Sequence, residues 1–307
     1  MRISLLLIML SLPWSVSAKL YVTVIQGLAG NEHYSKQFDV QTKSITRAAN
    51  ELAGKDRVTV LSGKQASREN ILAHFSKLQK SVTGGDRVAL FLIGHGSFDG
   101  RQYKFNIPGP DLTDKDIGDI LQACAARRQL LVDISSASGA VLKQLKNDSR
   151  IIITATRSGN ERIAPRFGEY FVAALTDHSA DTNKNDAISV EEAFTYAERL
   201  TQDYYKNEGH LATEHPQLEG QHADQFILAR LATEQTKSTN PDVARLLKQR
   251  QDIDQQIDDL KTRKDDFNNR DDYYNKLQDL LLQASRLDEQ IDKLNGSSSD
   301  DSTNDNP

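Results

Sequence analysis

Two apolar stretches of this sequence each end in residues that can do chemistry. The first, residues 87–93, leads to His95 and Gly96, and the second, residues 129–134, leads to a run of serines that includes Ser136. Continuous apolar runs of this length are typical of strands buried on both faces of a parallel sheet. Reactive side chains in such sheets gather where the strands end at their carboxyl edge. A histidine and a hydroxyl at neighbouring strand ends are the base and nucleophile that nucleophilic catalysis requires.

The segments around these stretches alternate between strand and helix patterns. Helix patterns cover residues 34–52, 67–78, 113–124 and 141–145. Strand patterns cover residues 19–26, 56–61, 87–93, 129–134, 151–155 and 225–229. This alternation predicts an α/β fold with a mostly parallel central sheet. Residues 97–110 are rich in turn formers and partly alternating, and they predict a hairpin beside the candidate site.

The two motifs together resemble those of the caspase–hemoglobinase group of peptidases, and the secreted bacterial legumain-like proteins more than the caspases. In that group, a His-Gly pair ends one strand, and a Cys followed by x-Ser-Gly ends the next. His95-Gly96 matches the first motif and Ser138-Gly139 matches the second. Ser136 therefore occupies the position of the family's nucleophilic Cys.

The resemblance covers residues 20–230 and implies a three-layer caspase-like sandwich that carries out acyl transfer on a peptide bond. His95 would act as general base and Ser136 as nucleophile, with the N–H groups of Gly96 and residue 136 holding the oxyanion. Arg157 and Arg162 fall where family members build part of the substrate pocket, so they are expected to contact a peptide or protein substrate.

Ser136 leaves the activity open, because a serine hydroxyl is harder to deprotonate than a thiol and usually needs an oriented base. The acidic residue of the family, two positions before the nucleophile, is replaced by Ile134. Asp133 is the nearest carboxylate in sequence, but strand alternation does not fix whether it faces His95. Three interpretations remain: a working nucleophile, a catalytically inactive pseudopeptidase retained for binding, or a polar strand end. Ser135 and Ser138 are possible substitutes for Ser136.

Residues 181–192 resemble an EF-hand calcium loop. The ligand offsets fall on Asp181, Asn183, Asn185, the Ala187 carbonyl, Ser189 and Glu192. Asp186 stands where such loops normally have Gly, although Asp tolerates a left-handed conformation. The same sequence also reads as a capping box from Ser189 to Glu192 that opens a helix. We expect either weak Ca²⁺ binding or only a helix start, and no other cofactor is required.

Residues 241–295 carry apolar side chains at three- and four-residue steps, in two sets that are out of phase on either side of residues 268–272. This pattern predicts either a helical hairpin or one coiled coil with a phase shift. It suits self-association, packing on the main domain or docking of another protein. Residues 296–307 are rich in Ser, Asp and Asn, and they predict a disordered tail.

The remaining features bound the class of protein. Residues 1–18 have a basic start, a short apolar run and small residues before Lys19, which predicts a secretory signal peptide followed by an α/β domain over residues 19–235. We therefore expect export, to the periplasm of a bacterium, and no membrane attachment after cleavage. The net charge of −5 does not suggest nucleic-acid binding. Cys124 is the single cysteine, in a helix pattern typical of a core residue, so no intramolecular disulfide can form.

Overall fold

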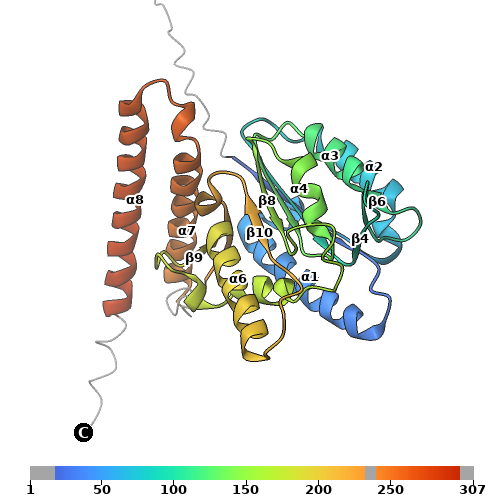
Figure 1. The fold of residues 1–307 in the computed structure, drawn as a ribbon. Helices are drawn as coiled ribbons and strands as arrows, with labels where there is room; N and C mark the ends of the chain where they lie inside the picture. The colour runs from blue at the N-terminus through green and yellow to red at the C-terminus, as the bar shows by residue number, and fades with distance from the viewer. Residues whose placement is uncertain (1–17, 232–239, 298–307) are drawn as a thin grey trace, which may run out of the picture.

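The computed structural model describes residues 18–231 and 240–297, and its central element is a six-stranded sheet (Figure 1). The strands lie in the spatial order β10 (Gln217–Glu219), β8 (Arg150–Thr154), β7 (Arg128–Asp133), β3 (Arg87–Ile93), β1 (Leu20–Gln26) and β2 (Val58–Leu61). All neighbouring pairs are parallel except β10 and β8, which are antiparallel. The predicted α/β fold with a mostly parallel sheet is therefore confirmed.

Helices cover both faces of this sheet. One face carries α1 (Glu32–Ala53), α5 (Phe167–Ala174) and α6 (Val190–Asn207), and the other carries α2 (Arg68–Leu78), α3 (Asp114–Gln122) and α4 (Leu142–Leu145). Short 3₁₀ turns complete the connections: η1 (Lys55–Arg57), η2 (Gly63–Ala66), η3 (Ser138–Val141), η4 (His178–Ala180) and η5 (Ala223–Gln225).

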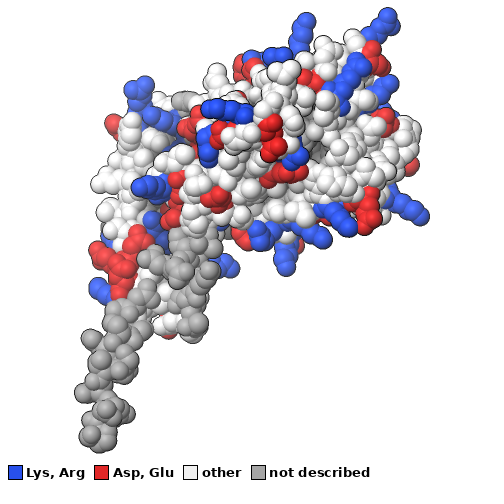
Figure 2. Space-filling model, turned by 60° about the horizontal axis from the view of Figure 1, so that its bottom comes forward, with Lys and Arg blue, Asp and Glu red and all other residues white. Residues whose placement is uncertain are grey.

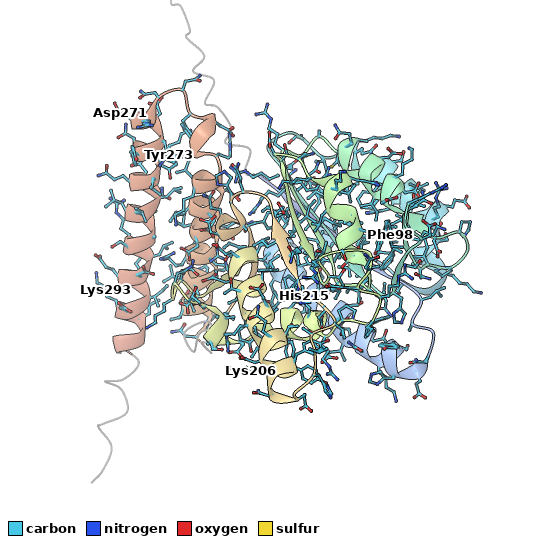
Figure 3. All side chains as sticks on the ribbon, in the orientation of Figure 1. Phe98, Lys206, His215, Asp271, Tyr273 and Lys293 are labelled. Atoms are coloured by element: carbon cyan, nitrogen blue, oxygen red, sulfur yellow. The ribbon has the colours of Figure 1, made fainter. Side chains whose placement is uncertain are left out.

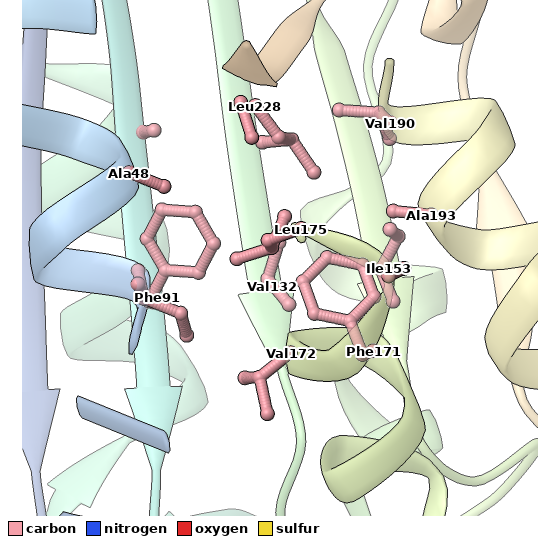
Figure 4. Packing of buried hydrophobic residues seen from close by; sticks show 14 of the residues in the cluster. Ala48, Phe91, Val132, Ile153, Phe171, Val172, Leu175, Val190, Ala193 and Leu228 are labelled. Carbon is pink, nitrogen blue, oxygen red and sulfur yellow. The ribbon is translucent and has the colours of Figure 1, made fainter. Parts of the chain in front are cut away.

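Alternate residues of each strand face opposite layers, as the period of two in a strand requires. In β3, Phe91 packs in the cluster beneath α1 and α5, whereas Leu90 and Leu92 pack in the cluster beneath α2 and α3. Figure 4 shows the first cluster, with Phe91 of the sheet and Phe171 of α5 among its rings. The result is a three-layer sandwich.

The sixth strand of the main sheet is not the one that the sequence predicts. The apolar run at residues 225–229 does form a strand, β11 (Ile227–Arg230), but it pairs antiparallel with β9 (Ala187–Ser189) in a separate two-stranded sheet. The edge of the main sheet is instead completed by β10, which has only three residues, none of them fully buried. So short a strand has no recognisable sequence pattern, because its position depends on pairing with β8 rather than on its own side chains.

The segment after His95 forms a small antiparallel sheet, which confirms the hairpin predicted over residues 97–110. Its strands are β4 (Gly96–Phe98), β5 (Tyr103–Phe105) and β6 (Leu112–Thr113). Tyr103 and Phe105 are fully buried beneath it. The insert therefore contributes side chains to the interior at the end of the main sheet where His95 lies.

The C-terminal helices form an antiparallel hairpin and not one continuous coiled coil. Helix α7 (Pro241–Thr262) is followed by the turn η7 (Lys264–Asp266) and by α8 (Arg270–Ser297), and Figure 1 shows the two helices side by side with α8 outermost. Their shared apolar contacts include Val243, Leu246, Ile253, Ile257, Ala284 and Ile291. The phase shift in the sequence therefore marks the turn.

Helix α7 packs on the main domain through two ion pairs. Arg87 at the start of β3 binds Asp259 at 2.8 Å, and both side chains are buried. Arg230, the last residue of β11, binds Asp258 at 2.8 Å. Of the roles considered for this segment, packing on the main domain is the one that the structure displays.

Three further predictions concern the ends of the chain and its cysteine. The predicted signal peptide and tail lie outside the described residues, apart from their boundary positions. No helix in the described part of the chain has the length and apolar character needed to cross a bilayer.

Cys124 is buried as expected, but it follows the end of α3 at Gln122 instead of lying within the helix, and it packs with Val82 and Val88.

Candidate active site

His95 lies two residues beyond the end of β3, and its imidazole is fixed by three neighbours. The ring meets Tyr34 and Phe38 of α1 edge-on, with centroids 4.6 and 5.2 Å apart. Its Nε2 atom is 3.2 Å from the carbonyl oxygen of Ala29. A carbonyl oxygen can only accept a hydrogen bond, so Nε2 carries the proton and Nδ1 of the neutral ring keeps a free lone pair. The ring is therefore oriented as a base.

Ser136 lies three residues beyond the end of β7, at the matching position of the neighbouring strand. The residue after it, Ala137, has a left-handed backbone with φ of +57°, which is costly for a residue with a Cβ atom. The Ala137 N–H donates to the carbonyl of Glu161 at 2.8 Å, and this bond holds the bend. Within the described residues, neither the N–H nor the hydroxyl of Ser136 has a hydrogen-bond partner, although the residue is only 4% exposed.

Gly96 brings the two segments together. A Cβ atom on Gly96 would lie 2.4 Å from the Ser136 carbonyl oxygen, 2.5 Å from Ser135 Oγ and 2.7 Å from the ring of Tyr103. Only glycine allows the chain after His95 to pass so closely over the end of β7. The structure thus confirms the predicted proximity of these strand ends, although no hydrogen bond joins His95 to Ser136 in the described structure.

The three serines of this segment differ in availability. Ser135 and Ser138 are fully buried. Ser135 Oγ contacts Tyr103 and the Ser136 carbonyl, and Ser138 Oγ accepts a hydrogen bond from the Thr156 N–H at 3.2 Å. Their hydroxyls are occupied by the structure, so Ser136 is the only one of the three that suits a nucleophile.

Close packing of the backbone explains why a glycine follows Ser138. A Cβ atom at this position would lie 2.2 Å from backbone atoms of Arg157 and Ser158. The Gly139 N–H donates to Thr156 Oγ1 at 2.9 Å. The loop after β7 is therefore packed directly against the loop after β8.

Asp133 does not face His95. Its side chain is fully buried and hydrogen-bonded to the Tyr103 hydroxyl at 2.7 Å and to the Ser135 N–H at 3.0 Å. Burial raises the pKa of Asp133 to about 6, although the hydrogen bonds from Tyr103 and Ser135 oppose the rise. The carboxyl group buried behind Ser136 is thus one whose pKa is about 6.

Arg157 and Arg162 lie on the loop after β8, and both are exposed. Arg157 Nε is 3.1 Å from Glu161 Oε1. The same carboxylate oxygen is 2.6 Å from Nδ1 of His215, which is labelled in Figure 3. The other carboxylate oxygen accepts a hydrogen bond from the backbone N–H of His215 at 3.1 Å. Glu161 therefore ties three loops together: its own, the one before β10 and, through Ala137, the one that carries Ser136.

Sequence reasoning missed Ala29, Glu161 and His215. Ala29 acts through its backbone carbonyl, a group that every residue has, so the sequence gives no sign of this role. Glu161 and His215 are 54 positions apart. Their proximity depends on β10 pairing with β8, the strand that the sequence did not predict.

The loop at residues 181–192 has one feature of a calcium loop and one that competes with it. Asp186 adopts the left-handed conformation expected of the glycine position, with φ of +57°. Glu192 forms the capping box with Ser189, and its carboxylate also accepts from the Thr182 N–H and hydroxyl and from the Asn183 N–H. A Ca²⁺ ion would have to take this carboxylate from those donors, so the residues fit weak binding at most.

The face turned forward in Figure 2 carries lysines and arginines interspersed with aspartates and glutamates, with broad uncharged areas between them. No single sign of charge dominates it.

Comparison with known proteins adds little to this geometry. No protein-family model matches the chain, and no curated protein matches it in sequence. Among solved structures, it is similar to the crystal structure of protein GSU0716 from Geobacter sulfurreducens. The sequence identity is 15% and the TM-score 0.47, and the match covers 70% of this chain and all of that one. Similarity at this level bears on no functional residue.

Proposed function

We propose that this protein is a caspase- and legumain-like endopeptidase, with His95 as general base and Ser136 as nucleophile. The observation that carries the proposal is the contact between His95 Nε2 and the Ala29 carbonyl at 3.2 Å. A serine nucleophile needs a base held in one tautomer by a third group. The Ala29 carbonyl supplies that group, and no carboxylate of the described residues hydrogen-bonds the ring.

The proposed reaction follows from this arrangement. His95 Nδ1 takes the proton from Ser136 Oγ as the oxygen attacks the carbonyl carbon of a peptide bond. The Ser136 N–H, which has no partner in the described structure, donates to the developing oxyanion, and Gly96 is the second donor proposed. The imidazolium then protonates the leaving amine, and water hydrolyses the acyl-serine with His95 again as base.

Arg157 and Arg162 are proposed to contact the substrate. Both are exposed on the loop that packs against the nucleophile loop at Gly139. The Arg157 guanidinium is already oriented by Glu161, so it is the better placed of the two to receive an acidic side chain.

A second candidate function is a catalytically inactive, exported binding module. Two observations favour it: Ser136 is only 4% exposed, and no hydrogen bond joins it to His95 in the described residues. The binding surface would then be the C-terminal hairpin, whose outer helix α8 exposes Tyr274 and Leu281. Export to a bacterial periplasm is proposed for either function, from the signal-like pattern of residues 1–18.

The test is cleavage of a diverse peptide library by the mature protein beside Ser136→Ala, Ser136→Cys and His95→Gln, with calcium present throughout. The endopeptidase proposal expects cleavage by the unmodified protein and none by Ser136→Ala or His95→Gln. Cleavage by Ser136→Cys alone would show an intact site without a competent nucleophile, which supports the binding module. Silence of all four proteins would refute the peptidase proposal.

A further inference from the structure

A continuous chain of oxygen atoms connects the buried carboxyl group of Asp133 to the backbone of Ser136. Asp133 Oδ2 is 2.7 Å from the Tyr103 hydroxyl, which is 2.7 Å from Ser135 Oγ, which is 3.1 Å from the Ser136 carbonyl oxygen. Asp133, Tyr103 and Ser135 are all fully buried. The hydrogens that bridge these oxygens must therefore come from the three groups themselves.

Counting those hydrogens shows that the ionised form of Asp133 is one short. The chain has three oxygen–oxygen contacts, and each needs one hydrogen. Tyr103 and Ser135 supply two. When Asp133 is ionised, Tyr103 donates to the carboxylate, because a charge-assisted hydrogen bond is the strongest available. The Ser135 hydroxyl must then choose between Tyr103 and the Ser136 carbonyl, and one contact is left without a hydrogen.

Protonation of Asp133 removes this conflict. The carboxyl hydrogen then bridges to Tyr103, the Tyr103 hydrogen bridges to Ser135, and the Ser135 hydrogen bridges to the Ser136 carbonyl. Each of the three contacts then has one hydrogen, and all three hydrogen bonds point from Asp133 toward the Ser136 carbonyl. The other carboxyl oxygen still accepts from the Ser135 N–H.

We propose that Asp133, acting through Tyr103 and Ser135, is a positioning residue whose proton determines whether the Ser136 carbonyl is held by a hydrogen bond. When Asp133 is protonated, the Ser135 hydroxyl fixes this carbonyl and with it the peptide that joins Ser136 to Ala137. When Asp133 is ionised, the Ser135 hydroxyl turns toward Tyr103, whose oxygen is nearer at 2.7 Å than the Ser136 carbonyl oxygen at 3.1 Å, and this peptide loses that support. The effect on catalysis rests on the proposed function, but the hydrogen-bond change does not.

The surroundings of Asp133 place this change in an accessible pH range. Burial raises its pKa to about 6. Two other charged or titratable groups flank the chain: Asp114 of α3, whose carboxylate accepts from the Tyr103 N–H at 3.3 Å, and His95, which precedes Gly96. Burial, together with the negative charges of Asp133 and, more weakly, Asp114, raises the pKa of Tyr103, so the phenol keeps its proton. Asp114 and His95 both need controls in a titration.

The experiment follows the amide nitrogen of Ala137, whose peptide contains the Ser136 carbonyl, by NMR of the mature protein. Labelling serine carbonyls with ¹³C and alanine nitrogens with ¹⁵N selects the Ser–Ala pairs, which the sequence has only at 17–18, 136–137 and 179–180. The Ser179–Ala180 signal serves as an internal reference for folding. We expect the Ala137 signal to titrate with a midpoint near the pKa of about 6.

Two variants interrupt the chain in different ways. Asp133→Asn keeps a donor toward Tyr103 at every pH, and Tyr103→Phe keeps the carboxyl group but removes the phenol. Both should abolish the titration of Ala137. His95→Gln, His215→Gln and Asp114→Asn leave the chain intact and should preserve it.

The outcomes separate this proposal from the peptidase proposal. An Ala137 signal that does not move between about pH 4.5 and 8 in the unmodified protein would overturn the inference. So would a titration that persists in Tyr103→Phe, or one that disappears in His95→Gln or His215→Gln. None of these results depends on peptide cleavage, so an inactive protein leaves the test intact. If the protein cleaves peptides, the pH dependence of kcat should have the same midpoint as the titration of the Ala137 signal.

Discussion

Replacement of Asp133 by Asn should change how the stability of the fold depends on pH. The pKa of Asp133 is raised from 3.8 to about 6 in the folded protein. Below pH 3.8 the carboxyl group is protonated in both the folded and the unfolded state, and burial carries no charge penalty. As the pH rises toward 6, the unfolded state releases its proton first, so the free energy of unfolding falls.

The magnitude follows from the size of the shift. A rise of about two pKa units corresponds to about 3 kcal/mol, which the unmodified protein should lose between about pH 4 and 7. Asp133→Asn has no proton to lose at this position. The free energy of unfolding of the unmodified protein, minus that of the variant, should therefore fall by about 3 kcal/mol over this range.

The assay is urea unfolding at equilibrium, followed by far-ultraviolet circular dichroism at several pH values. Asp148→Asn, which removes an exposed carboxylate near the start of β8, is the matched control for a change in charge. A constant difference between the unmodified protein and Asp133→Asn across the pH range would refute the reasoning. It would mean that folding does not raise the pKa of Asp133, so the carboxyl group would already be ionised and the change in hydrogen bonding would not occur in this pH range.

Three other predictions test other parts of the structure. Gly139→Ala should lower the free energy of unfolding, measured with urea, by about 3 kcal/mol or more, because its Cβ atom would lie 2.2 Å from backbone atoms. The control is Gly85→Ala, whose Cβ atom would meet nothing within 4 Å and which should be well tolerated. Arg87→Ala should lower the free energy of unfolding by about 3–5 kcal/mol, because it removes one partner of a buried ion pair. Replacing both Arg87 and Asp259 by leucine should recover most of this loss. Calorimetry should find Ca²⁺ binding no tighter than about 10⁻⁴ M, abolished by Glu192→Gln; tighter binding that survives this substitution would contradict the assigned ligands.

The sequence predicts the sandwich and the meeting of His95 with the Ser136 segment for one physical reason. Strands buried on both faces have an apolar signature, and parallel strands bring their carboxyl ends to one edge. The same reasoning fails at β10, whose three residues have no such signature. The same reasoning also predicts that the apolar residues of β11 join the main sheet, although β11 pairs with β9 in a separate sheet and is buried there.

The chemistry around the site was less predictable than its location. The orientation of His95 depends on a carbonyl at Ala29, and the partner of Asp133 is a tyrosine from the insert, 30 positions away. The register between β4 and β5 places Tyr103 opposite Phe98 and beneath Gly96. Neither contact follows from residue spacing, because each depends on how separate loops fold over the sheet edge.

The buried position of Cys124 has a practical consequence for spectroscopy. It is the single cysteine of the chain, and burial both shields it and raises its thiol pKa, so it should react slowly with maleimide dyes. A cysteine introduced at Tyr274 of α8 and another at Arg162 would then be the two fast-reacting positions. A donor and an acceptor dye at these positions would report whether the hairpin stays docked while the loop beside Ser136 binds a peptide.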